Sequence, residues 1–390
     1  MSELSYLEKL LDGVEVEWKS LGDVVNFQRG RRLVKSQLET RGKYAVYQNS
    51  MTPLGYYHEY NVAAQSSFII CAGAAGEIGY SENEFWAADD VHFAITPEYI
   101  NDRFLFHFLL TQKNKISGQV RRASIPRLSK SVIEKLEFPI PCPDNPEKSL
   151  AIQSEIVRIL DKFTALTAEL TAELNMRKKQ YNYYRDQLLS FDEGEVEWKA
   201  LEEVSTFANG KGHEKDISED GKYIVVNSKF ISTNGEVAKL SNKQLCPLFK
   251  DDILLVMSDL PNGKALSKTF IVDEDHKYTL NQRIGGITVK NSNELLPKFL
   301  HYFLNRTPQL LKHDNGVDQT NLRKGQILEV KIPIISLIKQ VQIVETLDKF
   351  DTYTKSISEG LPREIELRHK QYECYRDLLF SFPRPETASN

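Results

Sequence analysis

The chain has 390 residues, of which 41% are hydrophobic and 27% are charged, and its formal net charge is −4. A single hydrophobic core rarely grows past roughly 250 residues, so this length predicts at least two domains. The singly scattered cysteines exclude a close-paired zinc site, and no stretch approaches the ~20 apolar residues of a membrane helix. The acidic N-terminal segment is unlike a secretory signal, so we expect a cytoplasmic protein without metal, disulfide or membrane span.

An internal duplication organises the chain. The segment EVEWKSL at residues 15–21 recurs as EVEWKAL at 195–201, and RKKQYNYYRDQLLSF at 177–191 recurs as RHKQYECYRDLLFSF at 368–382. A repeat of domain length determines the architecture more strongly than local propensity does. Each half is therefore predicted to be a variable domain followed by a nearly constant helix.

The variable domains are predicted at residues 1–146 and 193–335. Short apolar runs such as YAVYQ, SFIICAG and DVHFAIT in the first, and YIVVN, DILLVM and GGITV in the second, alternate with Gly, Asn, Asp and Pro. This pattern is typical of strands and turns. A few helical segments are expected to interrupt the strands, for example at 104–116 and at 298–311. The fold class expected for both domains is α+β.

The constant helices are predicted at residues 147–192 and 336–383. Apolar residues recur in the first at helical spacing over many turns, from Ile156 and Leu160 to Leu188. A stripe of this length without a globular partner is typical of a coiled coil, and the obvious partner is the duplicate helix. We expect an antiparallel coiled coil that relates the two domains by a pseudo-twofold axis.

The second helix is predicted to be interrupted near residues 360–362. Gly360 weakens a helix, and Pro362 removes a hydrogen bond from a helix interior, although it fits the first turn of a resumed helix. Residues 384–390 are predicted to be a flexible tail.

Tyrosines also follow the helical spacing. We expect them to face the partner helix or another protein rather than stack on bases, and we expect the neighbouring arginines to pair with carboxylates. These residues are Tyr181, Tyr183, Tyr184, Tyr372 and Tyr375, with Arg185 and Arg376.

Motifs of a self-sufficient enzyme are missing from the sequence. An adenine methyltransferase needs an Asn/Asp-Pro-Pro-aromatic motif and a Gly-rich cofactor turn, and a P-loop needs Ser or Thr where Ala265 stands. The Glu-x-Lys of each EWK segment resembles a metal nuclease but lacks a preceding Pro-Asp ligand. Trp18 and Trp198 more simply seal a core at the start of a strand. The histidines form no spaced cluster, so each is expected to be satisfied or solvent-facing.

Basic and amide side chains gather at turns of both variable domains, despite the negative net charge. Direct readout of DNA uses Arg or Lys on guanine, Asn or Gln on adenine, and cations on phosphates. The candidates in the first domain are Arg29, Arg31, Arg32, Lys35, Gln48, Asn49, Arg121, Arg122 and Arg127. The candidates in the second domain are Asn209, Lys211, Lys215, Asn227, Lys229, Gln282, Arg283, Gln319, Asn321 and Arg323. Any one of them could be a solvated surface residue, so the prediction rests on their coincidence at equivalent points of two repeats.

The order of domains and helices resembles the specificity subunits of type I restriction-modification enzymes, over nearly the whole chain. GAAGEIGYSENEFWAADDVHFAI at 73–95 and SIPRLSKSVIEKLEFPIPCP at 124–143 are similar to that family's domain core and its exit into the helix. TALTAELTAELNMRKKQY at 164–181, with its tandem TAEL, resembles the IC subclass.

This resemblance implies a noncatalytic subunit whose two target-recognition domains each read one half of a split sequence in double-stranded DNA. It implies that the helices bind two modification subunits that methylate adenine, and that restriction subunits join this core. No cofactor is implied in this chain, while the complex would use S-adenosylmethionine, ATP and Mg. Two other classes stay open at this point: a self-sufficient enzyme, and a coiled-coil scaffold without DNA specificity.

Overall fold

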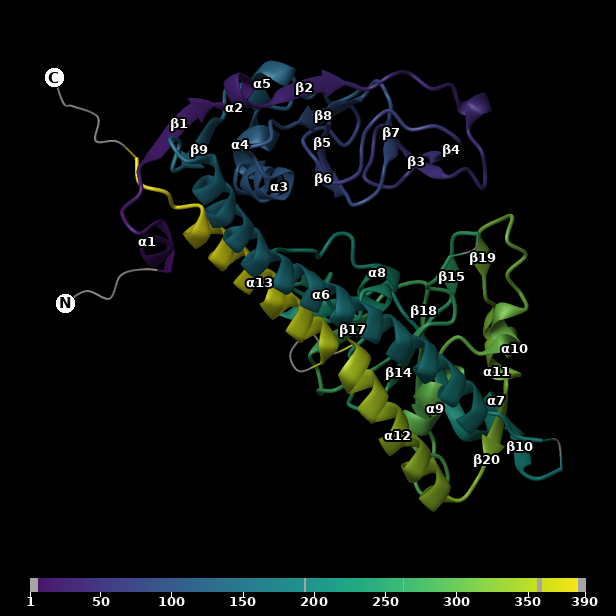
Figure 1. The fold of residues 1–390 in the computed structure, drawn as a ribbon. Helices are drawn as coiled ribbons and strands as arrows, with labels where there is room; N and C mark the ends of the chain where they lie inside the picture. The colour runs from purple at the N-terminus through teal and green to yellow at the C-terminus, as the bar shows by residue number, and fades with distance from the viewer. Residues whose placement is uncertain (1–5, 193, 262, 356–359, 385–390) are drawn as a thin grey trace. The chain divides into compact units, whose positions relative to one another are not determined.

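The computed structural model describes residues 6–192, 194–261, 263–355 and 360–384. The chain divides into two compact units, one of Met1–Glu173 with Arg363–Asn390 and one of Leu174–Pro362 (Figure 1). Helix α6 (Pro146–Leu188) continues through this boundary and contributes to both units. Within the described ranges, no helix is both long and apolar enough to cross a membrane.

The first unit contains a β-rich part from α1 to β9, which we call the first domain, followed by helices. Its elements are α1 (Tyr6–Leu11), β1 (Val16–Ser20), α2 (Leu21–Val24), β2 (Asn26–Arg29), the 3₁₀ helix η1 (Lys35–Gln37), β3 (Tyr44–Tyr47), β4 (Gly55–Tyr57), β5 (Ser66–Ile70), β6 (Ile78–Ser81), β7 (Phe85–Ala87), β8 (Val91–Ile95), α3 (Asp102–Thr111), α4 (Lys113–Gly118), α5 (Lys130–Glu134), β9 (Glu137–Pro141), the first part of α6, and α13 (Leu361–Leu379) from Arg363 onward. The strands form the sheets β2-β8-β5-β6, β4-β3-β7 and β1-β9.

Strand β5 lies at the centre of this domain's core, because all five of its residues are buried. Helix α3 packs against β5 and β6. Its N-cap is Asn101, whose side chain accepts hydrogen bonds from the backbone N–H groups of Arg103 at 2.9 Å and Phe104 at 3.3 Å. This cap satisfies donors that a helix start leaves free. Phe104 and Phe138 are fully buried, and burial of each ring stabilises the fold by about 2–3 kcal/mol.

The second unit contains a β-rich part from β10 to β20, which we call the second domain. Its elements are the last part of α6, β10 (Glu197–Ala200), α7 (Leu201–Val204), β11 (Ser205–Asn209), β12 (Tyr223–Val226), α8 (Ser228–Ser232), β13 (Lys239–Ser241), β14 (Ile253–Val256), β15 (Ser258–Asp259), β16 (Thr269–Ile271), β17 (Tyr278–Leu280), β18 (Ile284–Val289), α9 (Pro297–Leu304), α10 (Pro308–Leu311), β19 (Thr320–Asn321), α11 (Lys324–Leu328), β20 (Lys331–Ile334) and α12 (Leu337–Lys355). The strands form the sheets β11-β18-β14-β16, β13-β12-β17, β10-β20 and β15-β19.

The two domains repeat one topology. The order β2-β8-β5-β6 of the first corresponds to β11-β18-β14-β16 of the second, and β4-β3-β7 corresponds to β13-β12-β17. In both three-stranded sheets one strand pair is antiparallel and the other is parallel. The prediction of two mixed, β-rich domains is confirmed.

Both predicted helical segments inside the domains are interrupted. The segment expected at 104–116 is divided at Gln112 between α3 and α4. The segment expected at 298–311 is divided between α9 and α10, because Arg306 has a φ of 60°, in the left-handed region that a right-handed helix cannot contain. Pro308 then begins α10, at the helical position that proline favours.

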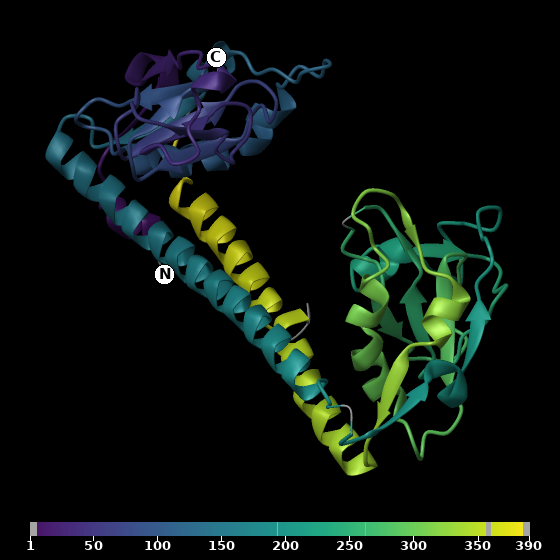
Figure 2. The same ribbon diagram turned by 90° about the vertical axis from the view of Figure 1, so that its right-hand side faces the viewer.

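The long helices pack through equivalent aromatic pairs. In the first unit Phe163 of α6 stacks on Tyr375 of α13 with ring centroids 5.0 Å apart, and in the second unit Tyr184 of α6 stacks on Phe350 of α12 at 5.8 Å. Figure 2 shows α6 side by side with α13 in the first unit and with α12 in the second. Most of the helical tyrosines are therefore interhelical as predicted, whereas Tyr183 is 62% exposed.

The helix ends agree with part of the predicted pattern. Helix α12 ends at Lys355 and α13 begins at Leu361, which places Pro362 in its first turn. Residues 356–359 and residues 385–390 of the predicted tail lie outside the described residues. The predicted arginine pairs are present, since Arg185 contacts Asp186 at 2.7 Å and Arg376 contacts Asp377 at 2.8 Å.

Candidate nucleic-acid interface

Backbone hydrogen bonds gather the segments that carry the predicted DNA contacts of the first domain. The carbonyl of Asn49 accepts from the N–H of Ala74 at 2.9 Å, and the N–H of Gly73 donates to the carbonyl of Pro126 at 3.2 Å. Gly73 has a φ of +82°, and a Cβ there would lie 2.7 Å from the Asn49 carbonyl oxygen, so glycine is required. The segments with Asn49 and with Arg121 to Arg127 therefore lie against one loop.

The loop after β2 joins the same place. The N–H of Arg31 donates to the carbonyl of Ala87 at 2.9 Å, and the N–H of Ala88 donates to the carbonyl of Tyr47 at 2.9 Å. A Cβ at Gly30 would lie 2.2 Å from the Ala88 carbonyl oxygen, so this close approach also depends on glycine. We call the gathered segments 29–35, 48–49, 71–74, 87–90 and 121–128 the loop edge of the first domain.

The second domain has the same backbone network with different side chains. The N–H of Lys211 donates to the carbonyl of Leu280 at 3.2 Å, and the N–H of Asn281 donates to the carbonyl of Val226 at 3.3 Å. These bonds match those of Arg31 and Ala88 in the first domain. A Cβ at Gly210 would lie 2.0 Å from the Asn281 carbonyl oxygen, as at Gly30.

A second pair of matched bonds completes this network. In the second domain the N–H of Met257 donates to the carbonyl of Arg283 at 3.0 Å, and the N–H of Leu322 donates to the carbonyl of Met257 at 2.7 Å. Cys71 occupies the place of Met257 in the first domain, with bonds to Asp90 and Leu128. The loop edge of the second domain thus consists of segments 209–215, 226–227, 257–259, 280–283 and 320–323.

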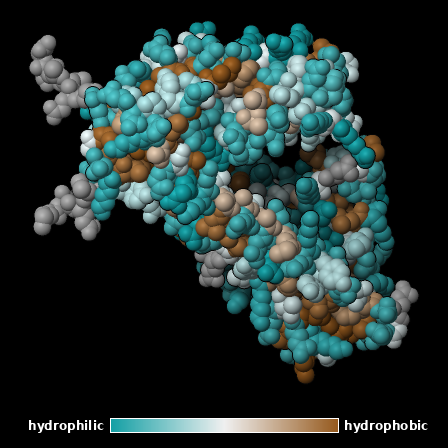
Figure 3. All heavy atoms as spheres, viewed as in Figure 1, coloured by the Kyte–Doolittle hydropathy of each residue, from teal (hydrophilic) through white to brown (hydrophobic). Residues whose placement is uncertain are grey.

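The predicted residues are accessible. All nineteen are exposed, except Gln48 and Asn227, which are half-buried. Some already have protein partners: Arg29 Nε donates to the Asp89 carbonyl at 2.6 Å, and Gln319 Nε2 donates to Ser258 Oγ at 2.8 Å. Figure 3 shows hydrophilic residues over most of the face that it draws. The assignment of these residues to DNA contacts stays a prediction.

A buried polar cluster attaches the first domain to its helices. His107 of α3 is fully buried, and its Nε2 lies 2.9 Å from Oδ1 of Asp161 in α6, while its Nδ1 lies 2.9 Å from the hydroxyl of Tyr372 in α13. Arg103 Nε donates to the same Asp161 oxygen at 2.9 Å. Burial lowers the pKa of His107 more than the Asp161 hydrogen bond raises it. Burial alone would raise the pKa of Asp161, but the hydrogen bonds from His107 and Arg103 hold it below its ordinary value.

The second domain is attached at the equivalent positions with other residues. The Tyr302 hydroxyl of α9 donates to Oδ1 of Asp348 in α12 at 2.6 Å, and Lys298 Nζ donates to Oδ2 of Asp348 at 2.6 Å. Asp161 and Asp348 are the aspartates of the repeated LDKF sequence. Burial raises the pKa of Tyr302, so its hydroxyl keeps the proton that it donates.

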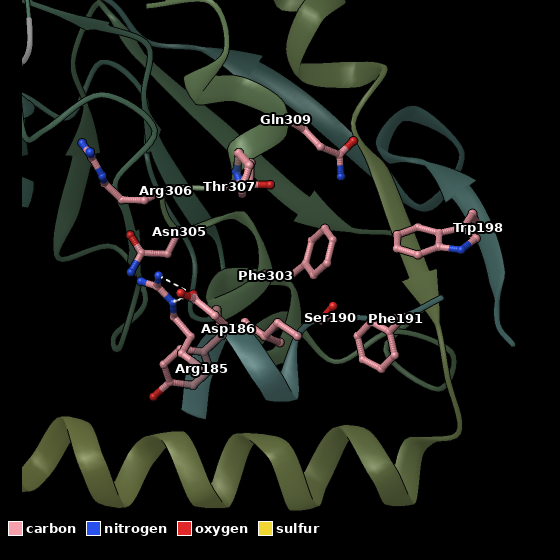
Figure 4. Close-up of a pocket in the computed structure, with 13 residues that line it drawn as sticks. Arg185, Asp186, Ser190, Phe191, Trp198, Phe303, Asn305, Arg306, Thr307 and Gln309 are labelled. Carbon is pink, nitrogen blue, oxygen red and sulfur yellow. Dashed lines mark hydrogen bonds and ion pairs between the residues drawn. The ribbon is translucent and has the colours of Figure 1, made fainter. Parts of the chain in front are cut away.

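Aromatic side chains pack together in each unit near the end of a long helix. In the second unit Phe191, Trp198 and Phe303 border a pocket of about 330 Å³, drawn in Figure 4. In the first unit Trp18 Nε1 donates to the Pro383 carbonyl at 2.9 Å, and buried Phe380 and Phe382 pack nearby. Trp18 packs against the core of the first domain, as predicted, and Trp198 is half-buried with its ring centroid 6.4 Å from that of Phe303. Within the described residues, no three His, Cys, Asp or Glu side chains lie close enough to hold a metal ion.

The sequence matches a known family in both halves. The sequence model of the type I restriction modification DNA specificity domain matches residues 13–177 and again residues 193–367. The chain belongs to the type I DNA specificity subunits. The specificity subunit of the Escherichia coli type I restriction enzyme EcoR124I/EcoR124II is 41% identical over 416 residues, covering 100% of both chains. A putative specificity subunit of Haemophilus influenzae is 34% identical, covering 97% of this chain and 98% of its own.

Solved structures support the fold of this specificity subunit. The crystal structure of a type I S subunit from M. genitalium matches with a TM-score of 0.58 at 18% identity, over 96% of this chain and 98% of that one. A chain from a structural study of complex assembly and conformational transition of the type I system matches with a TM-score of 0.55 at 14% identity, over 94% and 97%. At these identities the likeness shows the fold alone.

Sequence reasoning missed the attachment clusters. His107 was expected only to be satisfied or solvent-facing, and neither Asp161 nor Asp348 was singled out. A signal was present, because both aspartates belong to the repeated LDKF sequence, in which each lies two residues before a phenylalanine, Phe163 or Phe350, that stacks on another long helix. The segments RFLFHFL at 103–109 and KFLHYFL at 298–304 align His107 with Tyr302, but the two residues differ in type, so the alignment alone does not indicate that both contact an aspartate.

Proposed function

We propose that this specificity subunit is noncatalytic and reads a bipartite DNA target, one domain to each half-site. The observation that carries the proposal is the loop edge, which has one backbone network in both domains but different exposed side chains. Arg31 corresponds to Lys211 and Gln48 corresponds to Asn227. Two domains that recognise different DNA sequences are expected to share a backbone scaffold and to differ in the side chains that contact the bases.

We propose further that α6 forms an antiparallel coiled coil with the second-repeat helices, and that the domains are related by a pseudo-twofold axis. The repeated aromatic pairs, Phe163 with Tyr375 and Phe350 with Tyr184, support this pairing. The boundaries 1–146, 147–192, 193–335 and 336–383 stay predictions, as does the cytoplasmic location.

The partners proposed for this chain are double-stranded DNA, two modification subunits bound by the helices, and restriction subunits that join them. The cofactors S-adenosylmethionine, ATP and Mg would belong to those subunits, with none in this chain. The proposal rests on the family and on the resemblance of the tandem TAEL segment to the IC subclass.

Methylome sequencing of cells that express this chain with its modification subunit tests the function. We expect methylation at one split motif with two different half-sites, and none when either subunit is omitted. Methylation without sequence preference would favour a scaffold over a specificity subunit. Methyl transfer or DNA cleavage by the purified chain alone would contradict the noncatalytic role.

A further inference from the structure

A small polar pocket opens at the loop edge of the second domain. Its volume is about 280 Å³, and residues from separate segments line it. His213 and Glu214 follow β11, Asn227 follows β12, and Asn281 follows β17. The backbone bond from Asn281 to Val226 holds two of these segments together. The pocket therefore belongs to the surface assigned above to DNA.

The pocket has unused hydrogen-bond acceptors. Oδ1 of Asn281 is buried and has no hydrogen-bond partner among the described residues. Buried polar atoms are nearly always paired, so an orphan of this kind calls for a ligand or an ordered water. Glu214 is exposed, and its Oε1 accepts one hydrogen bond, from Gln282 Nε2 at 2.8 Å. A carboxylate can accept about four hydrogen bonds, so Glu214 keeps acceptor capacity.

Asn227, which lines the same pocket, supplies a hydrogen-bond donor. Oδ1 of Asn227 accepts from the backbone N–H of Phe230 at 2.9 Å, as the N-cap of α8. The cap fixes the amide, so its Nδ2 is the end left for a ligand. Both ring nitrogens of buried His213 are occupied, by the Lys211 carbonyl at 2.8 Å and by Thr279 Oγ1 at 2.9 Å. His213 is therefore a positioning residue in the pocket wall.

The polarity of the pocket is particular to the second domain. Aligning the two loop edges on Gly30 and Gly210, and on their matched backbone bonds, places Leu33, Val34 and Ala88 of the first domain where the second has His213, Glu214 and Asn281. Leu33 is buried, like His213, so the fold is kept while the chemistry changes. Such a change at equivalent points is expected where the two domains distinguish different bases.

We propose that this pocket reads the major-groove edge of an adenine in the half-site of the second domain, an inference that rests on the DNA-reading function proposed above. Adenine presents an acceptor, N7, beside an amino donor, N6. Asn227 Nδ2 donates to N7, and Glu214, with Asn281 behind it, accepts from N6. Guanine would place its O6 acceptor against the carboxylate, and cytosine and thymine offer no N7.

The test measures binding of the complex with its modification subunit to duplexes that carry base analogues. The adenine of the second half-site is replaced by purine, which lacks the N6 amino group, or by 7-deazaadenine, which lacks N7. We expect purine to weaken wild-type binding about tenfold and to have little effect on the Glu214→Ala variant. We expect 7-deazaadenine to weaken DNA binding by both the wild type and the Glu214→Ala variant.

The matched control is Glu219→Ala, which removes the same charge from an exposed residue of the same inter-strand segment. It should respond to both analogues like the wild type. A second half-site without an adenine, or an equal effect of purine on wild type and Glu214→Ala, would overturn the inference while leaving the function intact. Absence of any split motif for the wild type would instead contradict the proposed function.

Discussion

His107 Nδ1 lies 2.9 Å from the hydroxyl of Tyr372, and this contact joins helix α3 of the first domain to helix α13. Together with Asp161, it forms a polar attachment beside the hydrophobic core of the first domain. The second domain uses Tyr302 and Asp348 at the equivalent positions. One attachment contains an imidazole and the other does not, so the two should respond differently to acid.

Replacing His107 with Gln tests this difference. Burial lowers the pKa of His107 below its ordinary 6.5, so below that pH the unfolded chain binds a proton that the folded chain does not. Stability from His107 is then present above about pH 6.5 and falls as the pH drops. We expect His107→Gln to cost ~1–3 kcal/mol at pH 7.5 and less at pH 5.5.

Urea unfolding of both proteins across this pH range measures the effect. Only the difference between them is informative, because burial also raises the pKa of Asp102 to about 6 from 3.8, and this shift acts in the opposite direction: stability falls as pH rises through that window. Tyr302→Phe serves as the comparison in the second domain and should show no pH dependence between 5.5 and 7.5. A pH-independent cost of His107→Gln would rule out this role.

Gly210 offers a test of the loop edge. A Cβ there would lie 2.0 Å from the Asn281 carbonyl oxygen. We expect Gly210→Ala to destabilise the second unit by about 2 kcal/mol, because the backbone cannot yield without breaking the Lys211 bond. The control is Gly325→Ala in α11, where the added Cβ meets no atom within 4 Å apart from its chain neighbours and the backbone of its own helix. That change should be neutral or stabilise by up to ~1 kcal/mol. Similar unfolding midpoints for the two variants would show that the edge tolerates a side chain.

The sequence predicts features that arise from local residue patterns, but not those that depend on contacts between distant segments. Strand and helix positions could be inferred because β5 lies in a short apolar run, SFIICAG, and α6 has apolar residues at helical spacing. The break at Arg306 could not, since its positive φ is stabilised by a bond to the distant Ser267 carbonyl. Most loop-edge segments could be identified by their basic and amide residues, but segments 71–74, 87–90 and 257–259 contain none of the predicted residues. Glu214 and Asn281 were not, because only the folded chain shows an acceptor left without a partner.

Charge placement at the loop edge of the first domain gives another prediction. Replacing both Arg121 and Arg122 with Ala should weaken DNA binding and reduce the slope of log affinity against log salt by about 2, because each lost phosphate contact removes about 0.9. Assembly with the modification subunit should be unchanged. Fluorescence anisotropy at several salt concentrations measures the slope.

The control for this pair is Lys9→Ala with Lys148→Ala, which removes the same charge from exposed residues outside the loop edge. Its salt slope should equal that of the wild type. Loss of both DNA binding and subunit assembly in the arginine variant would indicate a structural role for Arg121 and Arg122.

The last prediction concerns the two TAEL units of α6, residues 167–170 and 171–174, as a ruler for the spacer between half-sites. Thr167 Oγ1 donates to the Phe163 carbonyl at 2.8 Å and Thr171 Oγ1 donates to the Thr167 carbonyl at 2.7 Å, so the units are equivalent turns of one helix. Each adds ~6 Å and a net rotation of about 40°. B-DNA rotates about 34° per base pair. The rotations nearly match, and groove entry depends more strictly on angular phase than on distance.

Deleting residues 171–174 should therefore keep both half-site sequences and shorten the spacer by one base pair, and a third TAEL should lengthen it by one. Long-read sequencing of methylated DNA from cells carrying each variant measures the spacer. An active variant with an unchanged spacer, or with altered half-site bases, would show that α6 does not set the spacing.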